Sequence, residues 1–132
     1  MMEDTIIRSI VEIESEDAVL LGQVAKTLGC SNTRALQFAI DQTFGIRTHA
    51  SNRGQVNFRD AKIERLFIPM TLEQKKERMK IEYQRKATFV DLCSEAIRTV
   101  HQNIEDFAKQ QTNQVLWRYL PKLKQNNKKG TT

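Results

Sequence analysis

The residue types that most often carry out chemistry in proteins are few in this chain and widely separated. Its two cysteines, Cys30 and Cys93, form no CxxC pair, and its two histidines, His49 and His101, form no HExxH motif. A structural zinc site needs four ligands at regular spacing, and these residues do not supply them. The five glycines match neither a GxGxxG nor a Walker pattern. We therefore expect no enzyme, no catalytic residues, no metal and no cofactor, and we interpret both cysteines as small buried side chains.

Charge is distributed unevenly along the 132 residues, whose formal net charge is +5. Residues 1–50 carry four basic and seven acidic side chains, whereas residues 62–132 carry fifteen basic and eight acidic ones. A basic region favours a polyanionic partner, most often nucleic acid. A solvated helix surface would explain the same charge equally well.

Membrane contact is not expected. No apolar run approaches the roughly 18 residues that a membrane-spanning helix needs. The acidic start of the chain also lacks the apolar stretch of a secretion signal. These features predict a cytoplasmic protein.

The first 45 residues predict a strand followed by two helices. Residues 6–13 are rich in Ile and Val, which favour a strand. Alternation divides this strand into one face with Ser9, Val11 and Ile13 and another with Arg8, Ile10 and Glu12. We expect Ser15 to cap a first helix ending at Gly29, and a second helix to begin near Ser31 and stop at Gly45.

The same order recurs after residues 46–61, which lack a sustained period. These residues are interpreted as a linker or an extended crossing segment that Val56 and Phe58 could anchor to a core. Residues 62–70 predict a strand, and Thr71 with Gln74 forms a capping-box pattern before a basic helix over 72–86. The inner face of that helix is predicted to hold Leu72, Met79 and Tyr83. Thr88 is predicted to cap a further helix, which we expect to continue towards Pro121.

One strand–helix–helix unit of about 40 residues has too little core to fold alone and exposes a strand edge. Two units solve both problems by pairing their strands antiparallel. The sequence thus predicts a mainly α fold with a short antiparallel β-ribbon. Such a ribbon fits the major groove of B-DNA, and helix N-termini beside it can bind phosphates.

Residues 8–44 resemble a ribbon-helix-helix unit of the Arc/MetJ type through the segments RSIVEI, VAKTLG and GCSNTRALQFAI. Residues 63–101 resemble a second unit through ERLFIPMT and ATFVDLCSEAIR. Two units in one chain are similar to the tandem arrangement of TraY-like relaxosome accessory proteins. The resemblance implies a tandem ribbon-helix-helix pseudo-dimer plus a C-terminal helical extension. The expected segments are a first unit (1–45), a linker (46–61), a second unit (62–102), the extension (103–121) and a disordered basic tail (122–132).

The resemblance also implies which residues would contact DNA. The base-reading positions fall on Arg8, Ile10 and Glu12 in the first unit and on Ile63, Arg65 and Phe67 in the second. The phosphate-binding positions at the start of each second helix fall on Ser31, Asn32, Thr33 and Arg34, and on Ala87, Thr88 and Phe89. Lys75 and Lys76 add phosphate contacts from the basic helix. We expect the basic helix over 72–86 to be one or two residues out of phase with the first helix of the first unit. A slip of one residue would exchange the inner and outer faces of the second strand.

Two functions remain open at this point. The first is a DNA-binding protein, implied to be a transcriptional repressor or a plasmid accessory in a relaxosome or in partition. Its partners would be double-stranded DNA, further copies of itself side by side, or a relaxase- or toxin-type protein. The alternative is a protein-interaction module, antitoxin-like or an oligomerising adaptor, whose units dimerise rather than read DNA.

Overall fold

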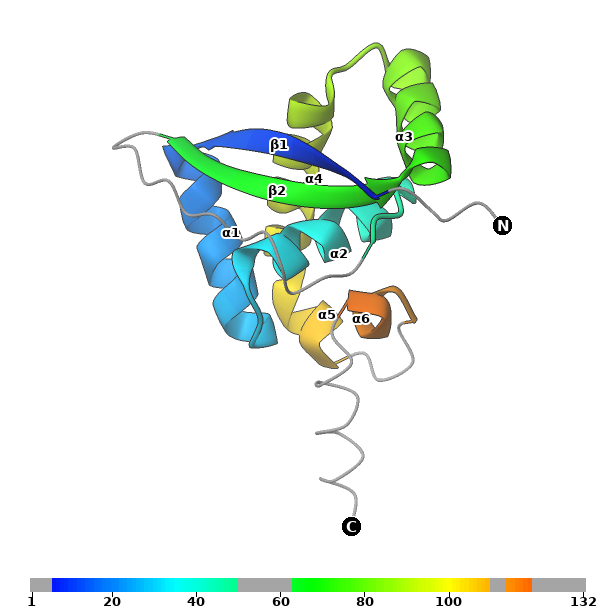
Figure 1. The fold of residues 1–132 in the computed structure, drawn as a ribbon. Helices are drawn as coiled ribbons and strands as arrows, with labels where there is room; N and C mark the ends of the chain where they lie inside the picture. The colour runs from blue at the N-terminus through cyan, green and yellow to red at the C-terminus, as the bar shows by residue number, and fades with distance from the viewer. Residues whose placement is uncertain (1–5, 50–62, 110–113, 120–132) are drawn as a thin grey trace.

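The computed structural model describes residues 6–49, 63–109 and 114–119. Within these ranges the chain is mainly helical with one two-stranded antiparallel sheet, as the sequence predicted (Figure 1). The elements follow in the order β1 (Ile6–Glu14), α1 (Ser15–Leu28), α2 (Asn32–Phe44), β2 (Ile63–Thr71), α3 (Leu72–Arg85), α4 (Phe89–Gln102), α5 (Ile104–Lys109) and α6 (Gln114–Tyr119).

The two strands, far apart in the sequence, lie side by side. Their register pairs Ile10 with Phe67 at the centre and Arg8 with Pro69 nearer one end. One face of this ribbon is buried through Val11, Ile13, Leu66, Ile68 and Met70. The alternation predicted for the first strand is therefore confirmed, since Ile10 and Arg8 lie on the opposite, exposed face.

Pro69 does not interrupt the ribbon. Its carbonyl accepts a hydrogen bond from the His49 N–H at 2.8 Å, so that side of the residue faces away from β1. Because N and O of one strand residue point the same way, the missing N–H of proline also lies on that outer edge. The β1–β2 ladder consequently loses no hydrogen bond.

The buried face of the ribbon rests on α1, α2 and α4, which lie beneath it in Figure 1. α2 and α4 cross at the centre of the core, with Leu36 and Ile40 from one helix and Cys93 and Ile97 from the other almost fully buried. Apolar residues at helical spacing thus form one continuous core below the strands.

Local signals fix most helix ends. The Ser31 hydroxyl accepts from the Arg34 N–H, and Thr71 and Thr88 each form a capping box, so the helix caps predicted at these three residues are confirmed. Gly29 adopts the left-handed conformation that ends α1, with φ 73°. The expected cap at Ser15 is wrong: Glu14 is the N-cap of α1, and Ser15 is already helical.

The two strand–helix–helix segments repeat at a constant spacing. Ile6 and Ile63 begin the strands, Glu14 and Thr71 cap the next helices, and each pair is 57 residues apart. The caps at Ser31 and Thr88 keep this spacing. The expected phase shift of one or two residues is therefore wrong, because each strand runs directly into its helix.

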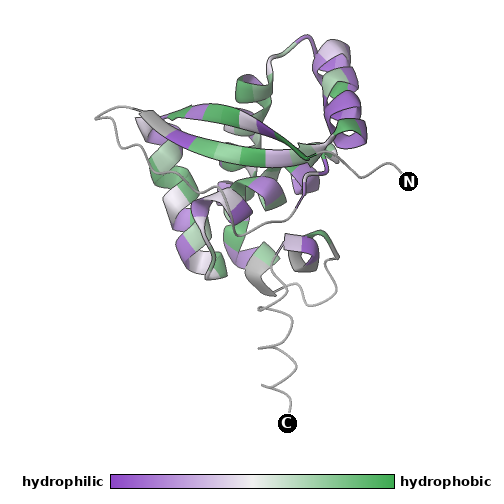
Figure 2. Ribbon diagram, in the orientation of Figure 1, coloured by the Kyte–Doolittle hydropathy of each residue, from purple (hydrophilic) through white to green (hydrophobic). Residues whose placement is uncertain are grey.

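α3 is oriented differently from the prediction. Leu72, Met79 and Tyr83 are exposed, by 51%, 53% and 86%, and no residue of α3 is buried. A mostly polar side faces the rest of the molecule instead, with Ile81 partly buried against the core. On this side Arg78 donates to the Ser9 hydroxyl and lies 4.5 Å above the Phe89 ring. Figure 2 shows α3 as a largely hydrophilic helix that stands beside the ribbon.

The predicted long C-terminal helix is also wrong, because the chain leaves the helix at Asn103 and forms the short helices α5 and α6. These helices are held by the core: the Phe107 ring meets Phe38 edge to face at 5.6 Å, and Tyr119 is fully buried. Ile46 and Thr48, at the start of the expected linker, are buried as well. Val56, Phe58 and the expected tail lie outside the described residues. No helix in the described ranges is long and apolar enough to cross a membrane.

Candidate nucleic-acid interface

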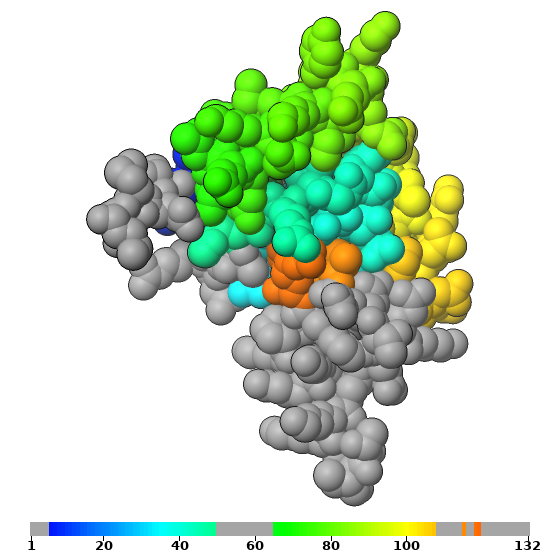
Figure 3. All heavy atoms as spheres, turned by 90° about the vertical axis from the view of Figure 1, so that its right-hand side faces the viewer, coloured from blue at the N-terminus to red at the C-terminus, as the bar shows by residue number. Residues whose placement is uncertain are grey.

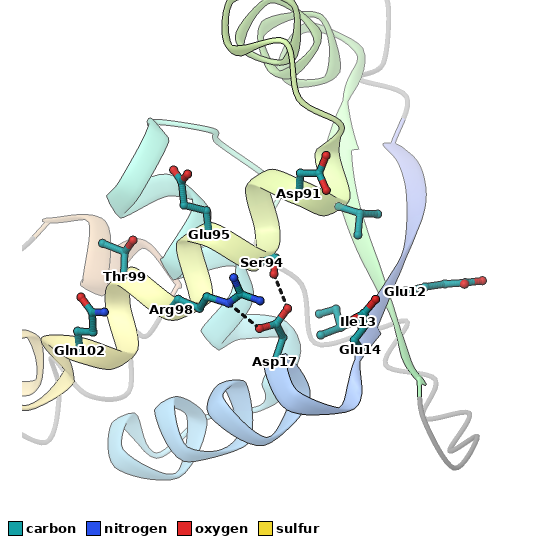
Figure 4. Close-up of a pocket in the computed structure, with 11 residues that line it drawn as sticks. Glu12, Ile13, Glu14, Asp17, Asp91, Ser94, Glu95, Arg98, Thr99 and Gln102 are labelled. Atoms are coloured by element: carbon teal, nitrogen blue, oxygen red, sulfur yellow. Dashed lines mark hydrogen bonds and ion pairs between the residues drawn. The ribbon is translucent and has the colours of Figure 1, made fainter.

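The outer face of the ribbon carries the residues predicted to read bases. Arg8, Ile10 and Glu12 are exposed on β1, and Arg65 and Phe67 are half-buried on β2. Ile63 begins β2, and its Cα pairs with that of Glu14. In Figure 4, Glu12 points away from the helices whereas Ile13 points towards them. The structure therefore brings the predicted readers together on one ribbon.

Arg8 and Arg65 occupy equivalent positions in the repeat but differ in their surroundings. The Arg65 Nε–H donates to Glu12 Oε1 at 3.2 Å across the ribbon. Arg8 forms no ion pair with any residue in 6–49, 63–109 or 114–119. The side chains of Arg65 and Glu12 are 43% and 52% exposed, so their ion pair contributes little and can open at low cost. Of the two ribbon arginines, Arg8 is consequently the more available to a ligand.

The middle of this face is apolar. Ile10 is 58% exposed and stands opposite Phe67 in the register. Apolar side chains in a major groove can contact the methyl group of thymine, and a carboxylate such as Glu12 can accept from the amino group of cytosine. The outer face thus combines two arginines, one apolar pair and one acceptor.

The start of α2, where phosphate binding was predicted, is partly occupied by other groups of the chain. Its first turn contains no acidic residue, which suits an anion. Ser31 and Asn32 are half-buried and Thr33 is buried. The Arg34 guanidinium donates to the backbone carbonyl of Tyr119, so α6 holds a side chain that was predicted to bind phosphate.

The start of α4 is less suited to phosphate. Asp91 lies in its first turn and accepts from the Thr88 N–H. This carboxylate uses a donor that an anion would need and repels negative charge. Phe89 is buried and Ala87 half-buried, which leaves Thr88 as the exposed member of the predicted set.

Lys75 and Lys76 lie at the start of α3, beside the Thr71 end of the ribbon (Figure 1). Lys76 is exposed and Lys75 half-buried, so both are reachable from solvent. α3 carries five basic and three acidic side chains, which makes this end of the ribbon positive.

The opposite end of β1 is negative, a feature the sequence analysis missed. A groove between β1, α1 and α4 is lined by the carboxylates of Glu12, Glu14, Asp17, Asp91 and Glu95 (Figure 4). Among them Asp17 is buried and paired, since it accepts from the Ser94 hydroxyl and from Arg98 Nε at 3.1 Å. These carboxylates come from separate elements, so no motif in the sequence signals them. A polyanion would approach the Arg8 and α3 end more readily than this groove.

The thiols offer little nucleophilic chemistry. Burial raises the pKa of Cys30 to about 12, although Arg34 opposes the shift, and burial also raises the pKa of Cys93. Both stay protonated near neutral pH, which makes them weak nucleophiles. Within the described part of the chain, no group of three or more His, Cys, Asp or Glu side chains could hold a metal ion.

No family model, curated protein or solved structure matches the chain. Function must therefore be inferred from the ribbon and its neighbouring helix ends. Their arrangement places two arginines and an apolar pair on a narrow surface that lies opposite the packed helices.

Proposed function

We propose that this protein binds double-stranded DNA by inserting the β1–β2 ribbon into the major groove. We further propose that its two strand–helix–helix segments form a tandem ribbon-helix-helix pseudo-dimer within one chain. The pairing of β1 with β2, two strands 57 residues apart in the repeat, carries this proposal. A two-stranded ribbon fits the groove width of about 12 Å.

In this mechanism each ribbon side chain contacts the base edge that suits its chemistry. Arg8 donates to the O6 and N7 atoms of guanine, and Arg65 does the same after leaving Glu12. Ile10 and Phe67 contact thymine methyl groups. Since the two strands differ in sequence, the preferred site is asymmetric, unlike the palindrome that a symmetric dimer selects.

Phosphate contacts would position the ribbon on the duplex. Lys75 and Lys76 lie near one end of the ribbon, and the first turn of α2 provides N–H groups without a competing carboxylate. These contacts carry no sequence information but supply salt-dependent affinity. A cytoplasmic repressor or a plasmid relaxosome or partition accessory would use such a surface.

The proposal is tested by selecting duplexes from a random-sequence pool and measuring affinity by gel shift at about 50 and 200 mM salt. Arg8→Ala should weaken binding to the selected site by about tenfold, the value of one good bidentate contact. Lys26→Ala, which removes an exposed cation on α1, serves as the matched control. A chain that shifts no duplex at either salt concentration is not a DNA-binding protein.

A protein-interaction module is the second candidate, because α3 exposes Leu72, Met79 and Tyr83 along one side. These residues recur at helical spacing, and an exposed apolar stripe of this kind suits a partner helix. The double variant Arg8→Ala with Arg65→Ala distinguishes the two candidates. Unchanged affinity for DNA would favour the interaction module, with a relaxase- or toxin-type protein as partner.

A further inference from the structure

The short helix α6 is fastened to α2 by its last two described residues. Arg118 forms an ion pair with Asp41, and the Tyr119 hydroxyl donates to the same carboxylate at 2.8 Å. The Thr48 N–H donates to the Tyr119 hydroxyl oxygen at 3.2 Å, so the segment after α2 grips the ring as well. Figure 3 shows α6 seated against α2 and residues 46–49.

The same helix reaches the first turn of α2. Arg34 donates to the Tyr119 backbone carbonyl, which draws its guanidinium towards α6. We propose that α6 is a latch that withholds Arg34 from DNA phosphate while it is closed and releases it on opening. This inference rests on the proposed function, since it concerns the phosphate-binding end of the same interface.

Some buried polar atoms of α2 and of residues 46–49 have no hydrogen-bond partner among the described residues. Gln37 Oε1, Thr48 Oγ1 and Thr33 Oγ1 are buried and accept or donate no hydrogen bond among the described residues. A buried polar atom without a partner costs free energy that hydration on opening would recover. All three atoms belong to α2 or to the segment 46–49, the two parts of the chain that α6 packs against.

The short length of α6 also favours its release from α2. It has six residues, and isolated helices much shorter than about 12 residues are not stable in water. α6 therefore persists through burial of the Tyr119 ring and through its contacts with Asp41, Thr48 and Arg34 rather than through its own helical stability. Removing two of these contacts should release it without unfolding the core beneath.

Tyr119 keeps its proton in the closed state. Burial and the neighbouring Asp41 carboxylate raise the pKa of its phenol. The hydroxyl consequently remains the donor to Asp41 across the neutral range, and replacing it with hydrogen removes a contact that is present at every pH of interest.

The test combines Arg118→Gln with Tyr119→Phe, which removes the ion pair and both hydrogen bonds of the phenol but keeps the ring. The chain has a single tryptophan, Trp117, and it belongs to α6. Fluorescence anisotropy of Trp117 should fall in the double variant, which reports release of α6 without DNA. Far-UV circular dichroism checks that the other helices remain, and Tyr119→Phe alone provides a milder variant.

Binding is then measured on the duplex selected for the wild-type protein. The double variant should bind on the order of tenfold more tightly, and its plot of log affinity against log salt should steepen by about 0.9, the value of one added phosphate contact. The variant has lost a positive charge, which alone would weaken binding, and Lys26→Gln measures that charge effect. Adding Arg34→Ala to the double variant should abolish the gain.

The outcomes separate the latch from the proposed function. Lower anisotropy with unchanged or weaker DNA binding overturns the latch and leaves the DNA-binding proposal intact. Unchanged anisotropy also overturns it, because α6 would then be held by other contacts. A failure of every variant and of the wild-type protein to bind any duplex overturns the proposed function itself, and the latch with it.

Discussion

α1 and α3 hold the same place in the repeat, yet α1 is part of the core and α3 contributes no buried residue to it. α1 buries Asp17, Leu21, Val24, Ala25 and Leu28. The residues 57 positions later in α3 are Gln74, Arg78, Ile81, Glu82 and Arg85. Four of these five are polar or charged, and burying them without hydrogen-bond partners would destabilise the fold. Side-chain chemistry at the inward positions, not the order of elements, therefore decides which helix joins the core.

The loss of α3 from the core is offset by α6. On one side of the molecule Asp17 of α1 pairs with Arg98 of α4, and on the other Arg118 of α6 pairs with Asp41 of α2. Asp41 and Arg98 are 57 residues apart and so occupy equivalent positions, but the charges are reversed. A helix from outside the repeat thus covers α2 much as α1 covers α4.

The largest expected effect comes from shortening side chains at equivalent positions of α1 and α3. Leu21→Ala should lower the free energy of unfolding by about 3 kcal/mol, because Leu21 is fully buried and its removal leaves a cavity. Arg78→Ala should lower it by about 1 kcal/mol, since Arg78 loses a cation–π contact and partly exposed polar contacts. Urea denaturation measures both. Equal losses would show that α3 contributes to the core as much as α1 does.

The two reversed ion pairs should contribute different amounts to the free energy of unfolding. Asp41→Ala is expected to cost about 2 kcal/mol, because it removes the acceptor of both Arg118 and the Tyr119 hydroxyl. Asp17→Ala is expected to cost about 1 kcal/mol, since the Arg98 side chain is 60% exposed and returns to water. Thermal unfolding of the two variants side by side provides the measurement. A greater loss for Asp17→Ala would indicate that α6 contributes less than its contacts imply.

Features controlled by neighbouring residues were predicted well from the sequence. Strand alternation placed Val11 and Ile13 inside, and the caps at Ser31 and Thr71 follow from hydroxyl groups that reach an N–H three residues away. Such interactions depend on local geometry, so a single sequence contains them. The predicted pairing of β1 with β2 followed from a simple need, since neither strand can satisfy its edge alone.

Features controlled by distant residues were not predictable in the same way. The exposed side of α3 looked like an inner face because Leu72, Met79 and Tyr83 share a helical period, and periodicity does not say which surface is available to cover them. Tyr119 lies 78 residues from Asp41, and no local pattern links them. The Arg65–Glu12 bridge likewise depends on the register between strands from the two units.

Arg65 is paired with Glu12 whereas Arg8 has no ion pair among the described residues, and one substitution on the ribbon can remove this difference. Glu12→Gln should strengthen DNA binding by about fivefold, because it frees Arg65 and removes a negative charge from the outer face of the ribbon. Glu105→Gln, an exposed carboxylate on α5, controls for the change in net charge. In the Glu12→Gln background Arg65→Ala should cost as much affinity as Arg8→Ala. If Arg65→Ala remains silent there, only the first unit reads DNA.

The smallest expected effect concerns the residues that end α1 and α3. Both adopt the left-handed conformation, but Gly29 has φ 73° without strain whereas Lys86 has φ 53° with a side chain. That conformation costs a non-glycine residue about 1 kcal/mol. A glycine avoids this cost, but its greater freedom in the unfolded chain cancels about half of the resulting stabilisation. Lys86→Gly should therefore raise stability by about 0.5 kcal/mol and the melting temperature by about 2 °C. Lys86→Gln removes the charge but keeps the strain, so it should leave the melting temperature unchanged. A gain from Lys86→Gln would mean that charge repulsion, rather than backbone strain, distinguishes the end of α3 from that of α1.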